Sequence, residues 1–456
     1  MAKYKAYPEY KDSGVEWLGE VPNHWKTVSI SRLFSRIKRT GYTEKELLSV
    51  YRDYGVIPKS SRDDNNNKPS EDLSPYQLVE PNDLVMNKMK AWQGSIAISE
   101  YEGIVSPAYF VYKPNNILFE LAHPRYVHYL LRNPIYVTQY LSRSKGIRVN
   151  QWDLDPDEFR NIELLLPDKT EQEKIYSFLD HETAKIDNLI EKQQQLIELL
   201  KEKRQAVISH AVTKGLNPDV PMKDSGVKWL GEVPAHWDSV RVKQVSSFIT
   251  SGPRGWSDYI TDDGDEIFLQ SGDLNNELGL HLDKAKRVSP PKNAEGIRTR
   301  LMNGDVVICI TGANTGRVAI VSKLSQKTYI NQHLSLIRPE IPKINSSFLG
   351  YCLASSNGHS YFEVAQYGLK EGLNLSNIAE APLALPPLHE QDAIVKYLKC
   401  VQNNYDYLSC LSANQVGLLQ ERRAALISAA VTGKIDVRDW VAPDTQDVEE
   451  PQEATA

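Results

Sequence analysis

Cysteine is scarce in this chain of 456 residues, and long apolar runs are missing. The four cysteines never form a Cys-x-x-Cys pair, which excludes a disulfide scaffold or a thiolate zinc site. No stretch approaches the roughly 20 apolar residues of a membrane-spanning helix. The first residues have no apolar segment of the kind that secretory signals contain. We therefore expect a cytoplasmic protein that has no contact with a membrane.

The motifs of common catalytic sites are also missing. The sequence contains no Gly-x-Gly-x-x-Gly, no phosphate-binding loop ending in Lys-Ser/Thr, no His-Glu-x-x-His and no Gly-x-Ser-x-Gly. An Asn-Pro-Pro-aromatic or Asp-Pro-Pro-aromatic run, as in amino-methyltransferases, is absent too. The ten histidines are scattered, and the sequence supplies them with no partners. We predict no catalytic residue, no metal site and no cofactor bound by this chain.

Negative charge gathers at one end. The net charge is -6, and the last eighteen residues hold six acidic side chains and no Lys or Arg. We predict that residues 436–456 form an acidic disordered tail. The remaining chain is neutral, and a neutral body can still bind nucleic acid where its cations cluster.

The chain contains an internal repeat. Residues 11–25 recur as residues 223–237, with thirteen of fifteen positions identical. Two more segments, 166–172 and 202–213, recur 219 residues later as 385–391 and 421–432. The blocks between them, 26–165 and 238–384, share little. The near-identical repeated segments, which we call the frames, indicate one kind of partner that binds twice. The divergent blocks between them indicate two different ligands.

The frames predict two long helices. Residues 171–213 contain no Pro or Gly, Thr170 with Glu173 suggests a capping box, and Gly215 suggests the end of the helix. A heptad register gives seven apolar residues of ten at the a and d positions of each helix, with Leu189 and Leu196 among the d positions. This pattern predicts that the two helices form a coiled coil.

The variable blocks combine short apolar strands, such as 305–310, with helices, such as 123–132. The predicted fold class is α+β, with two globular domains separated by two long helices that form an antiparallel coiled coil, related by a pseudo-twofold internal repeat. The predicted parts are a first frame segment with domain 1 (1–165), a first spacer helix (166–216), a second frame segment with domain 2 (217–385), a second spacer helix (386–435) and the tail (436–456).

Several loops combine cations, an aromatic residue or an amide with glycines. Arg and Lys can neutralise phosphates or read guanine, and Gln and Asn can read adenine, although such loops are also ordinary solvated turns. The candidate DNA-binding residues are Lys88, Lys90, Trp92, Gln93, Arg143, Lys145 and Arg148 in the first block, and Arg254, Trp256, Arg298, Arg300, Asn314, Arg317 and Lys370 in the second. The repeated frames supply candidate partner-binding residues, namely Trp17, Trp229, Glu171, Gln172, Glu390 and Gln391.

The doubled frame, the two Leu-Pro-x-x-x-Glu-Gln helix starts and the two Arg-x-Ala-x-Ile-Ser-x-Ala-Val-Thr helix ends carry a resemblance. The chain resembles the specificity (S) subunit of type I restriction-modification enzymes over nearly all of its length up to about residue 435. Residues 87–94, 106–109 and 311–316 also look like motifs of the family's target recognition domains.

The resemblance implies that each variable block reads one half of a split, asymmetric double-stranded DNA sequence. Two modification (M) subunits would bind the duplicated frames, carry S-adenosylmethionine and methylate adenine N6, with base flipping. Restriction (R) subunits would add translocation and cleavage with ATP and Mg2+. Two alternatives stay open: a DNA-free coiled-coil adaptor that presents two domains to protein or small-molecule ligands, and an autonomous transcriptional repressor.

Overall fold

A computed structural model of the chain describes residues 4–52, 54–62, 69–146, 152–291, 294–366 and 372–442. The protein divides into two compact units. Unit 1 comprises Met1–Gln193 and Asn414–Ala456, and unit 2 comprises Gln194–Ala413. Each unit therefore combines one variable block with one end of each long helix.

The core of unit 1 is built on an antiparallel sheet of four strands in the order β4-β11-β8-β9. The central strand β8 is covered on both faces: Leu84 and Met86 belong to one apolar cluster and Val85 to another. The strands are β4 (Phe34–Ile37), β8 (Leu84–Asn87), β9 (Ile96–Ile98) and β11 (Tyr109–Pro114).

Unit 2 repeats this sheet, with antiparallel strands in the order β18-β24-β21-β22. Its central strand β21 alternates in the same way, with Val306 and Ile308 facing one cluster and Val307 the other. The prediction of two like-folded α+β domains is therefore confirmed, although the two blocks share little sequence. The strands are β18 (Ser246–Ser251), β21 (Val306–Cys309), β22 (Val318–Ile320) and β24 (Leu334–Pro339).

Smaller elements surround each sheet. In unit 1 they are α1 (Ile30–Leu33), β5 (Leu48–Tyr51), β6 (Gly55–Pro58), β7 (Gln77–Val79), β10 (Gly103–Val105), α2 (Asn116–Leu121), α3 (Pro124–Leu131), α4 (Pro134–Ser142), β12 (Ser144–Lys145), β13 (Asp153–Leu154), α5 (Pro156–Arg160) and the 3-10 helices η1 (Lys59–Ser61) and η2 (Ala91–Gln93). In unit 2 they are β19 (Glu266–Leu269), β20 (Lys286–Val288), α7 (Ala294–Thr299), β23 (Thr328–Ile330), α8 (Ser346–Ala354), α9 (Ser356–Ala365), α10 (Leu375–Ala379) and the 3-10 helices η3 (Val242–Gln244), η4 (Trp256–Tyr259) and η5 (Ser271–Asp273).

The repeated frame segment forms a β-hairpin in each unit, followed by a strand that closes the variable block. The closing strand pairs antiparallel with the last strand of its block, so each block starts and ends at one place. The hairpins are β1 (Tyr10–Asp12) with β2 (Glu20–Pro22) and β15 (Met222–Asp224) with β16 (Glu232–Pro234). The closing pairs are β3 (Lys26–Ser29) with β14 (Glu163–Leu166) and β17 (Asp238–Arg241) with β25 (Pro382–Leu385).

The two predicted helices are present as α6 (Lys169–Lys214) and α11 (Leu388–Val431). Gly215 has a φ of 77° just after α6, which confirms it as the residue that ends the helix. The predicted capping box is wrong, because Thr170 lies within the helix. Asp168 stands before α6 instead, and its carboxylate accepts the Glu171 backbone N–H at 2.9 Å.

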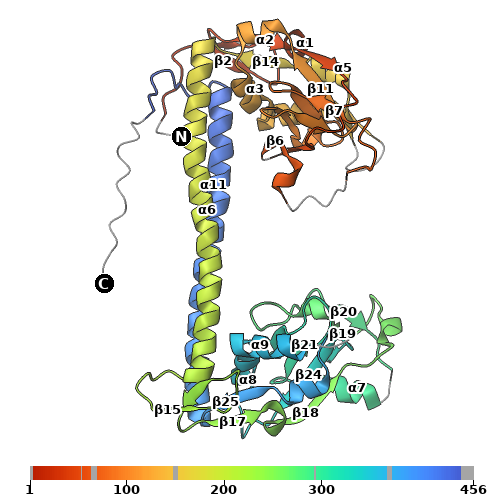
Figure 1. The fold of residues 1–456 in the computed structure, drawn as a ribbon, viewed down its shortest axis with the longest axis vertical. Helices are drawn as coiled ribbons and strands as arrows, with labels where there is room; N and C mark the ends of the chain where they lie inside the picture. The colour runs from red at the N-terminus through yellow and green to blue at the C-terminus, as the bar shows by residue number, and fades with distance from the viewer. Residues whose placement is uncertain are drawn as a thin grey trace. The chain divides into compact units, whose positions relative to one another are not determined.

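The long helices lie side by side in each unit and run in opposite directions (Figure 1). In unit 1 the Arg423 Nε of α11 lies 2.9 Å from Asp187 Oδ1 of α6, and in unit 2 Arg204 Nη1 of α6 lies 2.7 Å from Asp406 Oδ1 of α11. As residue numbers rise along one helix they fall along the other. The predicted antiparallel pairing is therefore confirmed.

The seam between the helices differs from the predicted one by one residue per heptad. The predicted d residues Leu189 and Leu196 are 47% and 39% exposed. The next residues in α6, Ile190 and Ile197, are half-buried instead. The seam therefore runs along the a and e positions, so the seven-residue period is right and the predicted a/d seam is wrong.

Residues 436–442 correct the predicted tail. Val437 is buried, the Trp440 ring packs edge-on against Phe178 at 5.7 Å, and the Asp436 N–H donates to the Lys5 carbonyl at 2.7 Å. This part of the chain is not disordered, because it completes the core of unit 1. Residues 443–456 lie outside the described residues. Among the described segments, no helix is long and apolar enough to cross a membrane.

Candidate functional site

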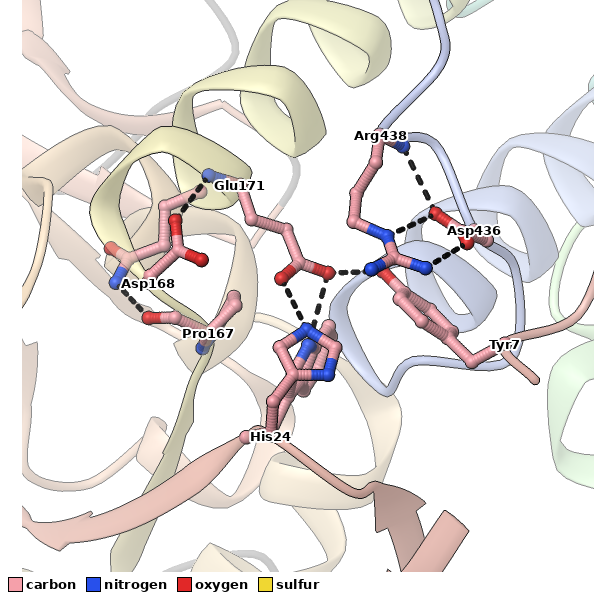
Figure 2. Close-up of polar contacts among 9 residues, drawn as sticks. Tyr7, His24, Pro167, Asp168, Glu171, Asp436 and Arg438 are labelled. Atoms are coloured by element: carbon pink, nitrogen blue, oxygen red, sulfur yellow. Dashed lines mark hydrogen bonds and ion pairs between the residues drawn. The ribbon is translucent and has the colours of Figure 1, made fainter. Parts of the chain in front are cut away.

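The first frame closes around one buried carboxylate, that of Glu171 at the start of α6 (Figure 2). Its Oε1 accepts the Tyr7 hydroxyl at 2.6 Å and the Trp25 indole N–H at 3.0 Å. Its Oε2 lies 2.6 Å from His24 Nε2. Burial and this carboxylate raise the pKa of the Tyr7 hydroxyl, which therefore acts as a donor.

The segment after α11 completes this cluster. The Arg438 guanidinium donates two hydrogen bonds to Asp436, at 3.0 and 2.6 Å, and it lies over the Tyr7 ring at 5.1 Å (Figure 2). The Tyr10 hydroxyl also donates to the Gly433 carbonyl at 3.0 Å. Residues from near both ends of the chain thus meet at the start of α6.

The second frame repeats the centre of this cluster. Glu390 near the start of α11 accepts the Trp237 indole N–H at 3.0 Å, and its other oxygen lies 2.8 Å from His236 Nε2. No tyrosine hydroxyl joins it among the described residues. The side chain of Glu390 is 31% exposed, whereas that of Glu171 is 2% exposed. The second carboxylate is therefore the less enclosed of the two.

The glutamine that follows each of these glutamates fastens the helix to the adjoining variable block. Gln172 accepts the His123 N–H at 2.8 Å and donates to the carbonyls of Leu121 and Pro167 at 2.9 and 2.8 Å. Gln391 makes the same three kinds of bond with Asn345, Lys343 and Pro386, at 2.8, 3.2 and 2.9 Å. Both glutamine side chains are fully buried.

These contacts correct the predicted partner-binding set. Glu171, Gln172 and Gln391 are buried and bound to their own chain, so their repetition has a structural cause. Glu390 is half-buried and already accepts two frame donors. Trp17 and Trp229 are half-buried and pack edge-on against Tyr136 and Tyr361, at 5.1 and 6.3 Å, so a partner contact through them stays a prediction.

In unit 1 four of the seven predicted DNA-binding residues lie in the loop between β8 and β9. Gly94 has a φ of 92°, which closes this loop. Trp92 stacks edge-on with Trp152 at 4.9 Å and donates to the Met89 carbonyl at 3.0 Å, so it orders the loop. Lys90 and Gln93 are exposed, and Lys88 is half-buried.

The other candidates of unit 1 lie after α4. Arg143 donates to the Gln139 backbone and side-chain oxygens and is half-buried. Lys145 is exposed and lies 3.8 Å from Asp155. Arg148 falls outside the described residues. Arg143 is therefore engaged within its own helix, and Lys145 forms a weak surface pair.

The equivalent loop of unit 2 joins β21 to β22. Gly316 takes the place of Gly94, with a φ of 87°. Asn314 donates to the Ser271 carbonyl at 3.2 Å, and Arg317 donates to the Leu274 carbonyl at 3.1 Å. Both side chains are half-buried, so they hold the loop against a neighbouring segment, a role that the sequence did not predict.

Trp256 is the clearest correction among the DNA-binding candidates. It is 2% exposed and packs against Phe268 and Tyr329 at 5.9 and 5.4 Å, so it forms core and cannot stack on a base. The nearby cations remain accessible. Arg254, Arg298 and Arg300 are exposed, and Lys370 lies outside the described residues.

Within the described ranges, no group of three or more His, Cys, Asp or Glu residues could hold a metal ion. The histidine with the most perturbed pKa, His128, lies half-buried on α3 beside β9. Its Nε2 accepts from Arg132 at 2.8 Å and its Nδ1 lies 3.3 Å from the Ile98 carbonyl. Burial and Arg132 lower its pKa to about 3. It is therefore a neutral structural histidine.

The fold defines a duplicated protein with two α+β domains whose sheets have the same strand order. Each domain is fastened to the long helices by a Glu-Gln pair, Glu171 with Gln172 or Glu390 with Gln391, which we call the latch. Comparison with known families agrees. The family described as "Type I restriction modification DNA specificity domain" matches twice, over residues 22–199 and 234–409. The chain belongs to this family.

Known relatives align with almost the whole chain. The putative type I restriction enzyme MjaX specificity subunit of Methanocaldococcus jannaschii is 23% identical, over 92% of this chain and 96% of the relative. The StySPI specificity subunit of Salmonella potsdam is 21% identical, over 91% and 90%. A solved structure titled as the basis of complex assembly and conformational transition of the type I R-M system covers 90% of this chain and 98% of its own, with a TM-score of 0.67 at 17% identity. That likeness supports the fold.

Proposed function

We propose that this chain is a sequence-specific DNA-binding subunit that recognises a bipartite, asymmetric double-stranded target. One observation carries the proposal. The same sheet order recurs in both units, while the loops that follow the central strands β8 and β21 carry different side chains. Lys90 and Gln93 stand in one loop, and Asn314 and Arg317 in the other. Equal scaffolds with unequal loops suit two unlike half-sites, because sequence is read by side chains at base edges.

The family membership and the names of the relatives support the enzymatic context of this proposal. Specificity subunits of type I restriction enzymes are the proteins to which the chain is similar. In our proposal the chain directs adenine-N6 methylation and restriction, both carried out by partner subunits in the cytoplasm. The partners are two M subunits with S-adenosylmethionine and R subunits with ATP and Mg2+, and this chain binds no cofactor.

The repeated frames favour two copies of one M subunit. The latch explains why the buried frame residues are repeated, but it does not explain the exposed ones. Lys11 and Glu20 are exposed in the first frame and recur as Lys223 and Glu232 in the second, also exposed. An identical charged surface that appears twice suits a partner that binds twice.

Co-expression of the chain with its M subunit tests this proposal. We expect native mass spectrometry to show two M subunits per chain, and sequencing of methylated adenines to show one split target. Replacing residues 26–165 with the block of another specificity subunit should change one half-site only. A complex with one M subunit, or a swap that alters both half-sites, would contradict the proposal.

A further inference from the structure

A concavity of about 730 Å³ opens in unit 1 between the β5–β6 hairpin and the β8–β9 loop. Among the described residues, three cations line it and no acidic side chain does. The lining residues used below are Arg52, Lys59, Asn87, Lys90, Gln93 and Tyr109, and we call this surface the cationic groove. Its charge suits a polyanion.

Arg52 was not among the predicted DNA-binding residues, because only the fold brings it to the β8–β9 loop. The position that a Cβ on Gly94 would occupy is 3.9 Å from the Arg52 Cγ. The stem of Arg52 thus passes beside the glycine that follows Gln93. Its guanidinium has no hydrogen-bond or ion-pair partner among the described residues, and the residue is exposed.

The hairpin that carries Arg52 is held from behind. Arg132 lies between α3 and α4, and its side chain donates to the Arg52 carbonyl. Gly55, with a φ of 76°, lies so close to His128 that a Cβ there would be 2.9 Å from the ring Cε1. These contacts hold the backbone at Arg52 and at Gly55, so the Arg52 side chain extends from a fixed backbone position.

The opposite wall of the groove is equally ordered. The Asn87 side chain accepts the Met89 N–H at 3.1 Å, and the Lys90 carbonyl accepts the N–H groups of Gln93 and Ser95 at 3.0 and 3.2 Å. The ends of Lys90 and Gln93 have no intramolecular partner in the described part of the chain. Two unengaged side chains thus stand on a rigid loop beside Arg52.

We propose that the cationic groove is the DNA-reading surface of the first recognition domain, with Arg52 and Gln93 as its specificity-determining residues; this inference rests on the proposed function. The planar Arg52 fork suits the O6 and N7 acceptors of guanine, and the Gln93 amide suits adenine N6 and N7. Lys90, a flexible point charge, binds a neighbouring phosphate.

The second recognition domain shows why these residues matter. There Arg317 and Asn314, in the equivalent loop, are bound to backbone carbonyls of residues 271–274. In the first domain the corresponding loop leaves Lys90 and Gln93 exposed. The two loops therefore lie at the same place in the fold, but in the second loop these side chains hold the loop itself.

The test uses the chain in complex with its M subunits and duplexes that carry the split target found by methylation sequencing. Competition with every single-base change in each half-site measures discrimination. Arg52→Ala and Arg52→Lys should both reduce discrimination at one position of one half-site by roughly tenfold, because a lysine keeps the charge but loses the fork. Gln93→Ala should do so at another position of the same half-site.

Lys90→Ala should weaken binding to all duplexes alike and lower the salt dependence by about one unit. The matched control is Lys113→Ala, an exposed cation four residues along β11 from Tyr109. It should leave both properties unchanged, and thermal unfolding should show every variant folded.

If Arg52→Ala discriminates at every position as the wild type does, the inference is overturned while the proposed function stands. The same holds if Arg52→Lys restores full discrimination, or if the loss is equal in both half-sites. If the wild-type complex shows no sequence preference for any duplex, the proposed function fails, and this inference fails with it.

Discussion

The guanidinium of Arg204 donates to the carboxylate of Asp406 at 2.7 Å and so joins α6 to α11. The same pair of residue types recurs in unit 1 as Arg423 and Asp187, each 219 residues from its counterpart. The two pairs are not equal, because Arg204 also donates to the Asn276 carbonyl at 3.1 Å. In unit 2 the arginine therefore links the helices to the recognition domain as well as to each other.

This difference predicts unequal effects of the same substitution. Arg204→Ala should lower the stability of unit 2 by about 1–2 kcal/mol, because a half-buried ion pair and a hydrogen bond are lost together. Arg423→Ala should lower the stability of unit 1 by about 0.5–1 kcal/mol, since only the ion pair is lost. Hydrogen exchange can report each unit separately. Equal losses would show that the Asn276 contact contributes nothing.

The two latch glutamates predict a second asymmetry. Glu171→Ala leaves the buried donors of Tyr7 and Trp25 without an acceptor, which should cost about 2–4 kcal/mol. Glu390→Ala leaves only Trp237 and the exposed His236, and should cost about 1–2 kcal/mol. Thermal unfolding of both variants checks this. A larger loss for Glu390→Ala would contradict the assigned roles.

The low pKa of His128 predicts an acid-sensitive unit 1. The folded protein keeps this histidine neutral down to about pH 3, whereas the unfolded chain takes up a proton near its ordinary pKa of 6.5. Stability is therefore full above pH 6.5 and falls as the pH drops from 6.5 toward 3. At pH 5 the loss should be about 2 kcal/mol.

The control for this prediction is His128→Gln, which cannot titrate. Its stability should change less than that of the wild type between pH 7.5 and pH 5, as measured by denaturant unfolding. The other histidines are common to both proteins and cancel in the comparison. An identical pH dependence of both proteins would show that His128 is not the group responsible.

The antiparallel helices predict a change of spacing when they are lengthened. One heptad inserted after Gln195 and one after Asn414 keeps the seam on the same face, because the period is seven residues. The helices grow by about 10 Å. At about 3.4 Å per base pair, the preferred distance between half-sites should grow by about three base pairs.

Binding of this variant should also be weaker, because three base pairs turn the second half-site by roughly a quarter turn, which bending or twisting must absorb at a cost of a few kcal/mol. Competition among duplexes that differ only in spacer length measures the optimum. A folded variant with the original optimum would show that the helices do not set the spacing.

Much of the architecture could be predicted from local patterns. The repeat, the α+β character of both blocks and the two long helices follow from residue identity and periodicity, and each is present in the fold. The strand predicted at 305–310 is β21, and the helix predicted at 123–132 is α3. Such features depend on neighbours within a few turns of the chain.

The site was predicted less well. The loop at 87–94 was identified because its cations and glycines are adjacent in sequence, whereas Arg52 lies some 40 residues earlier and could not be linked to it. Trp256 looked like an accessible aromatic residue beside Arg254, but it fills the core. Composition alone does not tell which side of a loop faces solvent.

By itself, the sequence determined that the chain is duplicated, that its helices have a seven-residue period and that its frames are under a common constraint. The tertiary structure decided what that constraint is: Glu171 and Gln172 satisfy donors and acceptors contributed by distant segments. It also decided that Ile190, and not Leu189, faces the other helix. The physical reason is that burial and hydrogen-bond partners are properties of packed elements, and a periodic pattern allows more than one packing angle.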